Sequence, residues 1–313
     1  MYNKFNYLLC MLLIVICCSW GFYAHKKINH AAVFTLPTQL AAFYKKHIDV
    51  ITEKAVDADK RCYVDSLESP RHFIDVEEYE DGYVDAIPIH WSQAVEKFQE
   101  RKLHANGIVP WQIYFTYQKL VKAFREKNTD AIIRHSADLG HYVSDAHVPL
   151  HTTRNYNGQL TGQIGIHAFW ESRLPEMFAD DYNLFVGKAR YLDSPLDSAW
   201  AIIRESNALV DSVLLFEKEL SNTFPKHLQR SYITRNNILI STYSDAYANA
   251  YHQRMQGMVE DRMRKSIQRT GSFWFSAWVD AGQPSLKGKF KADQNEGTSD
   301  IQQGEIIGRE EWH

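Results

Sequence analysis

The chain has 313 residues, of which 45% are hydrophobic, and its formal net charge is −3. That length and composition allow one large domain with a sizeable core, and they exclude a basic protein that holds polyanions through bulk charge. If the substrate is a nucleic acid, bound metal must supply much of the positive potential.

Residues 1–19 have the features of a signal peptide. Lys4 precedes an apolar run at residues 7–18, which is too short to cross a bilayer comfortably. The small residues Cys17 and Ser19 stand third and first before a cut at Trp20. We therefore expect an exported bacterial protein, periplasmic or secreted, whose mature chain begins at Trp20.

Cleavage would remove three of the four cysteines and leave only Cys62. An intrachain disulfide is then impossible, so a large core or bound metals must stabilise the exported chain. The sequence also contains no N-x-[ST] acceptor for glycosylation, which favours a bacterial protein.

Helical apolar spacing recurs along the mature chain. Between residues 91 and 98 the apolar side chains fall at i, i+3, i+4 and i+7, which predicts an amphipathic helix. Pro110 is placed to open the next helix, and Thr129 or Asp130 is placed to cap the one that continues to Asp145.

Two further long helical patterns cover residues 194–216 and 228–265. No internal repeat and no strong run of alternating strands interrupts these patterns. We predict an all-α, single-domain helical bundle over residues 20–285, followed by a flexible polar tail at residues 286–313.

The densest group of possible metal ligands lies within residues 140–178. His141 and Asp145 are four residues apart, as are His167 and Glu171, so each pair shares one helix face. His151 lies just after Pro149, where the first of these helices should end.

A single pair of this kind is usually a surface hydrogen bond rather than a metal site. Two pairs that flank a glycine-rich loop, with a further histidine beside a proline, instead favour metal binding. Because the ligands are imidazole and carboxylate without cysteine, the ion would be zinc or another borderline divalent cation.

The sequence resembles a superfamily that contains the bacterial zinc-dependent phospholipase C and the zinc-dependent single-strand nucleases of fungi and plants. The motifs that carry the resemblance are Trp20 with the nearby His25, the segment HFID at residues 72–75, and GHYVSDAHVPLH with HAFWES at residues 140–172. The resemblance implies a helical bundle of the phospholipase C and P-one nuclease type, with a cleft for three zinc ions.

The ligands that the resemblance implies are nitrogen and oxygen donors from several parts of the chain. They are Trp20 (amino nitrogen and carbonyl oxygen) and His25 for one ion, Asp75, His90 and His141 for a second, His151, His167 and Glu171 for a third, and Asp145 as a bridge.

Two residues of this set would also be catalytic. Two zinc ions that share the Asp145 carboxylate can share a water, whose pKa falls toward neutrality, and the resulting hydroxide would attack phosphorus. Asp75 could orient the attacking water, and no protein nucleophile is needed. Asn155 and Asn157 could contact substrate phosphate, although a turn role fits Asn157 equally well because Gly158 follows it.

Three other polar residues lie next to these ligands in the sequence. We expect His72, Asp138 and His147 to be hydrogen-bond partners of ligands rather than ligands themselves.

The substrate expected from the sequence is single-stranded nucleic acid or nucleotides. The spacing from Trp20 to His25 is nuclease-like, whereas Glu171 and the short loop after His151 are phospholipase-like. A phospholipase C stays the alternative, although no apolar lip is legible. A helical envelope protein that binds zinc without turnover is the alternative of another class. No protein partner is evident, and we expect a monomer.

Overall fold

The computed structural model describes residues 22–79, 82–235 and 238–286, and within these residues helices dominate. The α-helices are α2 Phe22–Ala32, α3 Thr38–Lys46, α4 Ile48–Glu53, α5 Asp57–Arg61, α6 Trp91–Phe98, α7 Glu100–Ala105, α8 Val109–Glu126, α9 Thr129–His147, α10 Ile166–Ala168, α11 Leu174–Phe178, α12 Pro195–Asn207, α13 Val210–Thr223, α14 Asp245–Arg254 and α15 Met258–Asp280. Two strands, β1 Arg230–Arg235 and β2 Ile238–Tyr243, form one antiparallel hairpin.

Short helical turns connect several of these elements. They are η1 Val33–Thr35, η2 Lys54–Val56, η3 Ser69–Arg71, η4 Val76–Glu78, η6 Val84–Ala86, η7 Pro149–Thr152, η9 Lys226–Leu228 and the π-helical turn η8 Phe169–Arg173.

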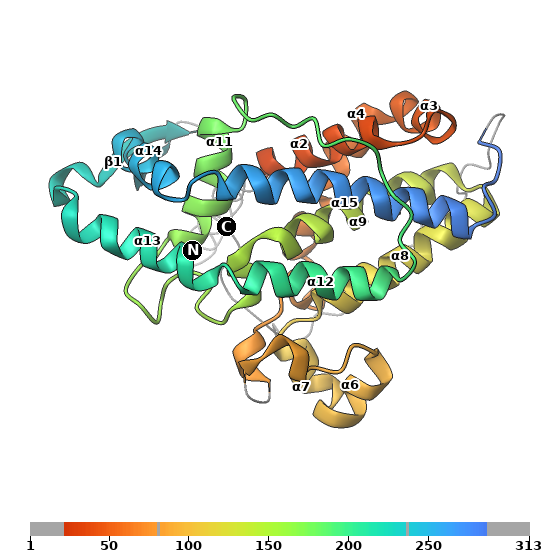
Figure 1. The fold of residues 1–313 in the computed structure, drawn as a ribbon, viewed down its shortest axis with the longest axis horizontal. Coiled ribbons are helices and arrows are strands. Elements are labelled where there is room, and N and C mark those ends of the chain that lie inside the picture. The colour runs from red at the N-terminus through yellow and green to blue at the C-terminus, as the bar shows by residue number, and fades with distance from the viewer. Residues whose placement is uncertain (1–21, 80–81, 236–237, 287–313) are drawn as a thin grey trace, which may run out of the picture.

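Helix α9 is the central element of the bundle. It contacts α2, α4, α8, α12 and α15, and every residue from 136 to 150 is buried. Figure 1 shows α9 enclosed by these longer helices. Polar side chains on α9 therefore face other elements of the protein, and each must find a partner there.

Close helix contacts at glycine bring other elements against the bundle. A Cβ atom on Gly140 of α9 would lie 1.9 Å from Asn29 Oδ1 of α2, and one on Gly271 of α15 would lie 1.9 Å from Thr35 Oγ1. Only glycine permits these approaches. The first of them places α2 directly beside the part of α9 that carries His141.

The predicted helical character is confirmed, while several predicted boundaries are wrong. Helix α9 is capped by Asn128, whose Oδ1 accepts a hydrogen bond from the backbone nitrogen of Ala131, rather than by Thr129 or Asp130. The pattern at residues 194–216 is divided between α12 and α13.

The predicted helix over residues 228–265 is also wrong. Residues 230–243 form the hairpin, and α14 and α15 follow it. Residues 232–234 (Tyr-Ile-Thr) and 238–240 (Ile-Leu-Ile) are rich in β-branched residues, which favour strands, and Tyr243 stacks on Phe169 with ring centroids 3.9 Å apart. Tertiary packing and β-propensity therefore override the helical spacing.

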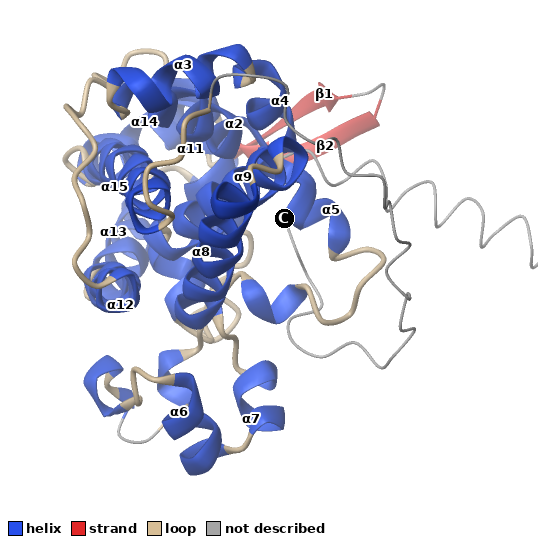
Figure 2. Cartoon of the chain, turned by 90° about the vertical axis from the view of Figure 1, so that its right-hand side faces the viewer, coloured by secondary structure: helices blue, strands red, loops and turns tan. Residues whose placement is uncertain are grey.

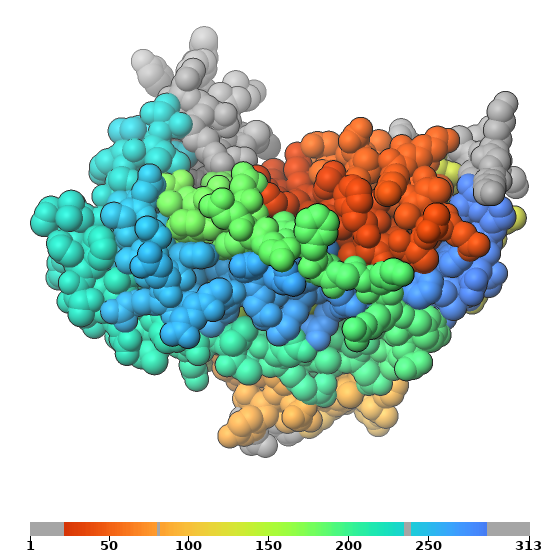
Figure 3. Space-filling view, turned by 45° about the horizontal axis from the view of Figure 1, so that its top comes forward, coloured from red at the N-terminus to blue at the C-terminus, as the bar shows by residue number. Residues whose placement is uncertain are grey.

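Two parts of the chain project from the bundle. The hairpin extends away from the helices at one end (Figures 2 and 3), and α6 with α7 forms a lobe on another side (Figure 1). The lobe is tied to the bundle at Ile89, whose carbonyl oxygen accepts hydrogen bonds from the indoles of Trp111 and Trp200.

None of the described helices is long and apolar enough to cross a membrane. The predicted signal peptide and Trp20 lie outside the described residues, as does the predicted tail from residue 287 onward.

Candidate metal centre

Buried histidine and carboxylate side chains form three groups that could hold metal ions. Within each group the candidate ligand atoms lie within 4.8 Å of one another. The groups are His25, His141 and Asp145; Asp59, His72 and His141; and His151, His167 and Glu171. Every member is at most 4% exposed.

Several elements from different parts of the chain bring these side chains together. His25 lies on α2 and Asp59 on α5, and His72 follows η3. His141 and Asp145 are one turn apart on α9, so their side chains emerge on one face. Pro149 opens η7, which turns the chain so that His151 faces the same region, and His167 with Glu171 spans the junction of α10 and η8.

The π-helical turn at Glu171 is a notable local feature. An isolated π-turn inserts one extra residue per turn into a helix and redirects the side chains that follow, and such turns are common at functional sites. Here it runs through residues 169–173 and directs Glu171 toward His151 and His167.

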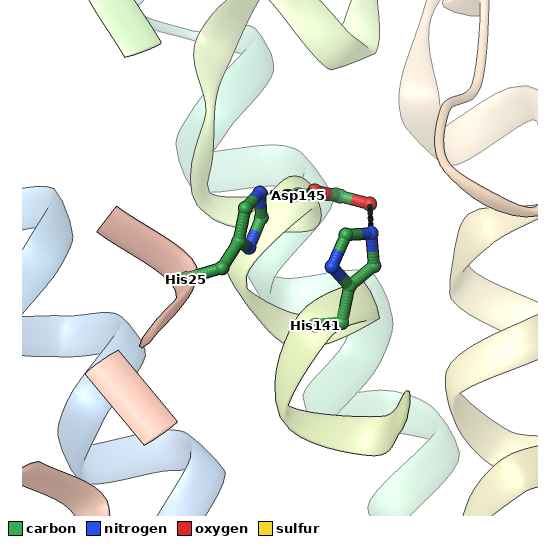
Figure 4. A group of neighbouring side chains, drawn as sticks. All are labelled: His25, His141 and Asp145. Atoms are coloured by element: carbon green, nitrogen blue, oxygen red, sulfur yellow. Dashed lines mark ion pairs between the residues drawn. The ribbon is translucent and has the colours of Figure 1, made fainter. Parts of the chain in front are cut away.

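The Asp145 carboxylate lies between two sets of histidines. Its Oδ1 is 3.4 Å from His25 Nε2, and its Oδ2 is 3.2 Å from His141 Nε2 (Figure 4). The same Oδ2 is 2.9 Å from His72 Nδ1. One carboxylate therefore faces two adjacent candidate ion positions, one beside His25 and one beside His72 and His141. At the second of these, Asp59 Oδ1 also lies 3.3 Å from His141 Nε2.

The Glu171 carboxylate is divided in the same way. Its Oε2 is 3.1 Å from His151 Nε2 and 2.9 Å from His167 Nε2, while its Oε1 is 3.3 Å from His25 Nε2. The His25 ring thus lies between Asp145 and Glu171 and links all three groups. It also stacks on His141 with ring centroids 4.3 Å apart.

The innermost polar atoms lack hydrogen-bond partners. His25 Nε2, Asp145 Oδ1 and Glu171 Oε1 are buried and make no hydrogen bond. Burying such atoms unsatisfied is costly. Two donors that bind one tetrahedral zinc at about 2.1 Å lie roughly 3.4 Å apart, and His25 Nε2 lies 3.4 Å from Asp145 Oδ1 and 3.3 Å from Glu171 Oε1. The donors therefore fit metal ions.

Backbone carbonyls fix the orientation of two of the imidazoles. His141 Nδ1 lies 2.8 Å from the carbonyl oxygen of Ala55, and His151 Nδ1 lies 2.7 Å from that of His72. Because a carbonyl only accepts, each Nδ1 must carry a proton, and each Nε2 is the nitrogen that faces the centre and could bind metal. This is the arrangement that metal-binding histidines use.

His72 presents the opposite nitrogen to the centre. Its Nδ1 faces Asp145, while its Nε2 lies 3.6 Å from Glu68 Oε1 and 3.5 Å from Cys62 Sγ. Glu68 is fully buried, and Arg61 and Arg71 also pair with it. A buried carboxylate at the outer nitrogen favours a proton there, which leaves Nδ1 free to bind metal.

Both shared carboxylates are ionised. Burial alone would raise the pKa of Asp145, but the charge and hydrogen bonds of His141 and His72 outweigh burial and hold its pKa well below the ordinary range. Burial would likewise raise the pKa of Glu171, and His151, His167 and His25 lower it. Metal ligands must be deprotonated, so this electrostatic environment suits cation binding.

No family model matches this chain, and no curated protein matches it.

Six of the predicted ligands lie in these groups, namely His25, His141, Asp145, His151, His167 and Glu171. The predicted role of Trp20 concerns a residue outside the described part of the chain.

Two predicted ligands, Asp75 and His90, lie outside the three groups, and Asp59 and His72 stand with His141 in their place. Burial and then the Asp75 charge raise the pKa of Tyr79. His90 is exposed at the start of α6, in the projecting lobe.

The structure also places the remaining predicted residues. Asn155 bonds Thr161 and the backbone of Leu160, and Asn157 Oδ1 accepts a hydrogen bond from the backbone nitrogen of Gly165, so both brace their own loop. Asp138 pairs with Arg61.

His147 contributes to packing rather than to the groups. Its Nδ1 bonds the carbonyl oxygen of Val143, while burial and then Arg262 and Arg269 hold its pKa well below the ordinary range. It is therefore neutral at physiological pH. Of the three residues predicted to assist ligands, only His72 joins a candidate ligand group.

The sequence contained a partial signal for the two missed residues. His72 opens the HFID segment that drew attention to Asp75, and Asp59 lies on the short helix α5 between Ala58 and Lys60. Their convergence on His141 depends on the turn at η3 and on the packing of α5 against α9. Sequence spacing does not encode either contact.

An apolar pocket adjoins the candidate metal centre. It reaches His25 and Glu171 and is otherwise lined largely by apolar side chains of α2, α15 and the α9–α11 region, among them Ile28, Trp170 and Val259. Apolar walls of this kind lower the local polarity and strengthen electrostatic interactions within the centre.

Proposed function

We propose that the protein is a zinc-dependent hydrolase of phosphoric ester bonds, with three zinc ions bound at the candidate metal centre. The observation that carries this proposal is the Asp145 carboxylate, which directs one oxygen to His25 and the other to His72 and His141. A shared carboxylate is the feature expected of neighbouring ions that act on one phosphoryl group.

The ligand set supports zinc over harder ions. The described groups contain five histidines, His25, His72, His141, His151 and His167, and no thiolate. Imidazole suits zinc, whereas magnesium and calcium prefer sites built from oxygen.

The arrangement also supports three ions. Because His141 Nε2 can bind only one ion, Asp59, His72 and His141 would hold one, and His151, His167 and Glu171 another. His25, Asp145 and Glu171 would hold the ion between them, where the resemblance adds the amino group of Trp20.

Bound zinc would polarise phosphoryl oxygens and lower the pKa of a bound water. The protein's own contribution is to keep Asp145 and Glu171 ionised and to orient the imidazole rings toward the ions. The rings are oriented by the carbonyl oxygens of Ala55 and His72 and by the carboxylate of Glu68. Asp145 is the residue to which we assign the central catalytic role.

The resemblance offers two substrate classes, and each has some support. For single-stranded nucleic acid, the Tyr156 ring lies edge-on to His167 at 5.9 Å and could stack a base. For phospholipid, the segments beside the centre expose aliphatic side chains, among them Leu160 and Leu239. The chemistry of ester hydrolysis is common to both.

Metal analysis combined with hydrolysis assays tests the proposal. We expect the mature protein to contain about three zinc ions and to hydrolyse bis-nitrophenyl phosphate until a chelator is added. Release of nucleotides from single-stranded DNA or RNA, or of phosphocholine from lipid, then identifies the substrate. Bound zinc without any hydrolysis would instead indicate a zinc-binding envelope protein.

A further inference from the structure

Two segments near the metal centre expose large apolar side chains. The first is the loop at residues 155–165, which leads directly to His167 and in which Leu160 is 60% exposed and Ile164 is 56% exposed. The second is the β1–β2 hairpin, in which Tyr232 is 70% exposed and Leu239 is 66% exposed. We call these two segments together the apolar rim.

The two parts of the rim contact each other. Arg230 Nη2 donates a hydrogen bond to the carbonyl oxygen of Ile164 at 3.3 Å, and the Arg230 guanidinium lies 3.8 Å from the centroid of the Tyr243 ring. Tyr243 in turn stacks on Phe169, which opens the π-turn that carries Glu171. The hairpin is therefore packed on the element that supplies a candidate metal ligand.

The register of the hairpin places its exposed apolar residues on one face. Arg230 pairs with Tyr243, Tyr232 with Ser241, and Thr234 with Leu239. Because side chains alternate between the two faces of a strand, Arg230, Tyr232, Leu239 and Tyr243 lie on the same face. Tyr232 and Leu239 are diagonal neighbours on it. On this face Tyr243 is buried against the bundle, whereas Tyr232 and Leu239 are exposed on the part of the hairpin that projects from the bundle (Figures 2 and 3).

The charge of these segments differs from that of the whole chain. The chain has 38 acidic and 35 basic residues, yet none of residues 146–170 or 220–244 is acidic. The hairpin region instead carries Lys226 and Arg230, and Arg230 shares the face of Tyr232 and Leu239. Arg154, in the loop region, is paired with Glu78 and adds little to this charge. The exposed apolar residues thus lie next to a local positive charge.

We propose that the apolar rim is a docking surface for a phospholipid bilayer, with Tyr232 and Leu239 of the hairpin inserted into the interface and Arg230, on the same face, directed to anionic headgroups. Aliphatic and aromatic side chains bordered by Lys and Arg are the composition that binds membrane interfaces. A surface for single-stranded nucleic acid would instead be built mainly from aromatic rings. The proposal goes beyond hydrolysis, because docking requires no turnover.

Cosedimentation of the metal-loaded, full mature protein with vesicles tests this proposal. The vesicles are phosphatidylcholine alone and phosphatidylcholine with a minority of phosphatidylglycerol. We expect binding that is stronger to the anionic vesicles. The double substitution Tyr232→Ser with Leu239→Ser should reduce binding at least about tenfold, because it removes the two exposed apolar side chains that the hairpin would insert.

Phe34→Ser is the matched control. Phe34 is also 60% exposed, but it lies in η1, which packs on α3 at the opposite end of the bundle from β1 (Figure 1). We expect this variant to bind vesicles like the wild type. All three proteins should have the same circular dichroism spectrum and the same rate on bis-nitrophenyl phosphate. This separates docking from the proposed hydrolysis, since either can be present without the other.

Three results would overturn the proposal. The first is a wild-type protein that sediments with neither vesicle, or a hairpin variant that binds as well as the wild type. The second is loss of binding to a single-stranded oligonucleotide in the hairpin variant while vesicle binding persists, which would assign the rim to nucleic acid. The third is a wild-type dimer in gel filtration that the hairpin variant converts to a monomer without change in vesicle binding.

Discussion

Gly140 lies against Asn29 with no room for a side chain between them, because a Cβ atom on Gly140 would lie 1.9 Å from Asn29 Oδ1. This contact sets the distance between α9 and α2. One residue further along α9, His141 stacks on His25, which α2 carries. The spacing of the metal centre therefore depends on the absence of a single methyl group.

Gly140→Ala should destabilise the protein although alanine favours helix. The propensity gain is about 1 kcal/mol, whereas overpacking typically costs about 1 to 3 kcal/mol. We expect a net loss of about 1 kcal/mol in the free energy of unfolding, measured by denaturant titration, together with weaker zinc retention. The double variant with Asn29→Ala removes the clashing atom and should recover part of both losses. Equal losses in the single and double variants would show that this contact does not set the spacing.

The choice between two ligand sets gives a second prediction. Asp59→Asn and His72→Ala should each lower the zinc content by about one ion, since each removes one ligand of a group of three. Asp75→Asn and His90→Asn are the matched variants from the set expected from sequence, and they should retain all of the zinc. Elemental analysis of the dialysed proteins measures this. Zinc loss in the second pair, with none in the first, would restore Asp75 and His90 as ligands.

These two sets show what could be predicted from the sequence and what could not. His141, Asp145, His167 and Glu171 are recognisable because helical spacing of four residues places each pair on one face. His151 is recognisable from the proline that ends the helix before it. Asp59 and His72 depend instead on how an irregular segment turns, which no periodicity reports. Their identification required the contact of α5 with α9 and the ring contact of His72 with His141.

The hairpin illustrates a second limit. Residues 228–265 have helical apolar spacing in part, and that spacing predicts one long helix. In the structure Tyr243 stacks on Phe169, which is distant from it in the sequence, so a tertiary contact helps to decide the local conformation. The apolar rim was illegible from sequence for the same reason, because it arises only when the hairpin and the loop come together.

Glu68 should act on metal binding through His72. Glu68→Gln removes the charge that favours a proton on the outer His72 nitrogen, so we expect about 10- to 100-fold weaker binding of one zinc ion, measured by chelator competition. A cobalt-substituted protein should also show a changed absorption spectrum. Glu217→Gln is the control, because Glu217 is likewise buried but bonds Tyr247 and Gln163 instead. An equal effect in both variants would indicate a general loss of stability.

Protonation of His135 should account for part of the stability that the fold loses at acidic pH. Burial, followed by the charges of Arg134 and Lys119, lowers the pKa of His135 from 6.5 to about 4. A histidine whose pKa is depressed in the folded state contributes stability above its unfolded pKa, and that contribution is lost as the pH falls from 6.5 toward 4. His135→Gln should therefore show a smaller decrease of Tm over this range than the wild type. Parallel curves for the two proteins would contradict this.

Metal removal should destabilise the fold as well as abolish hydrolysis. Without cations, the carboxylates of Asp145 and Glu171 and the ring of His25 keep buried atoms that lack hydrogen-bond partners. A ligand at 1,000 times its Kd contributes about 4 kcal/mol per site, so chelation should lower Tm by many degrees. Added zinc should restore the original Tm, whereas magnesium should restore little of it because the sites are rich in imidazole. A Tm that is the same with and without chelator would mean that the described groups hold no ion in the native protein.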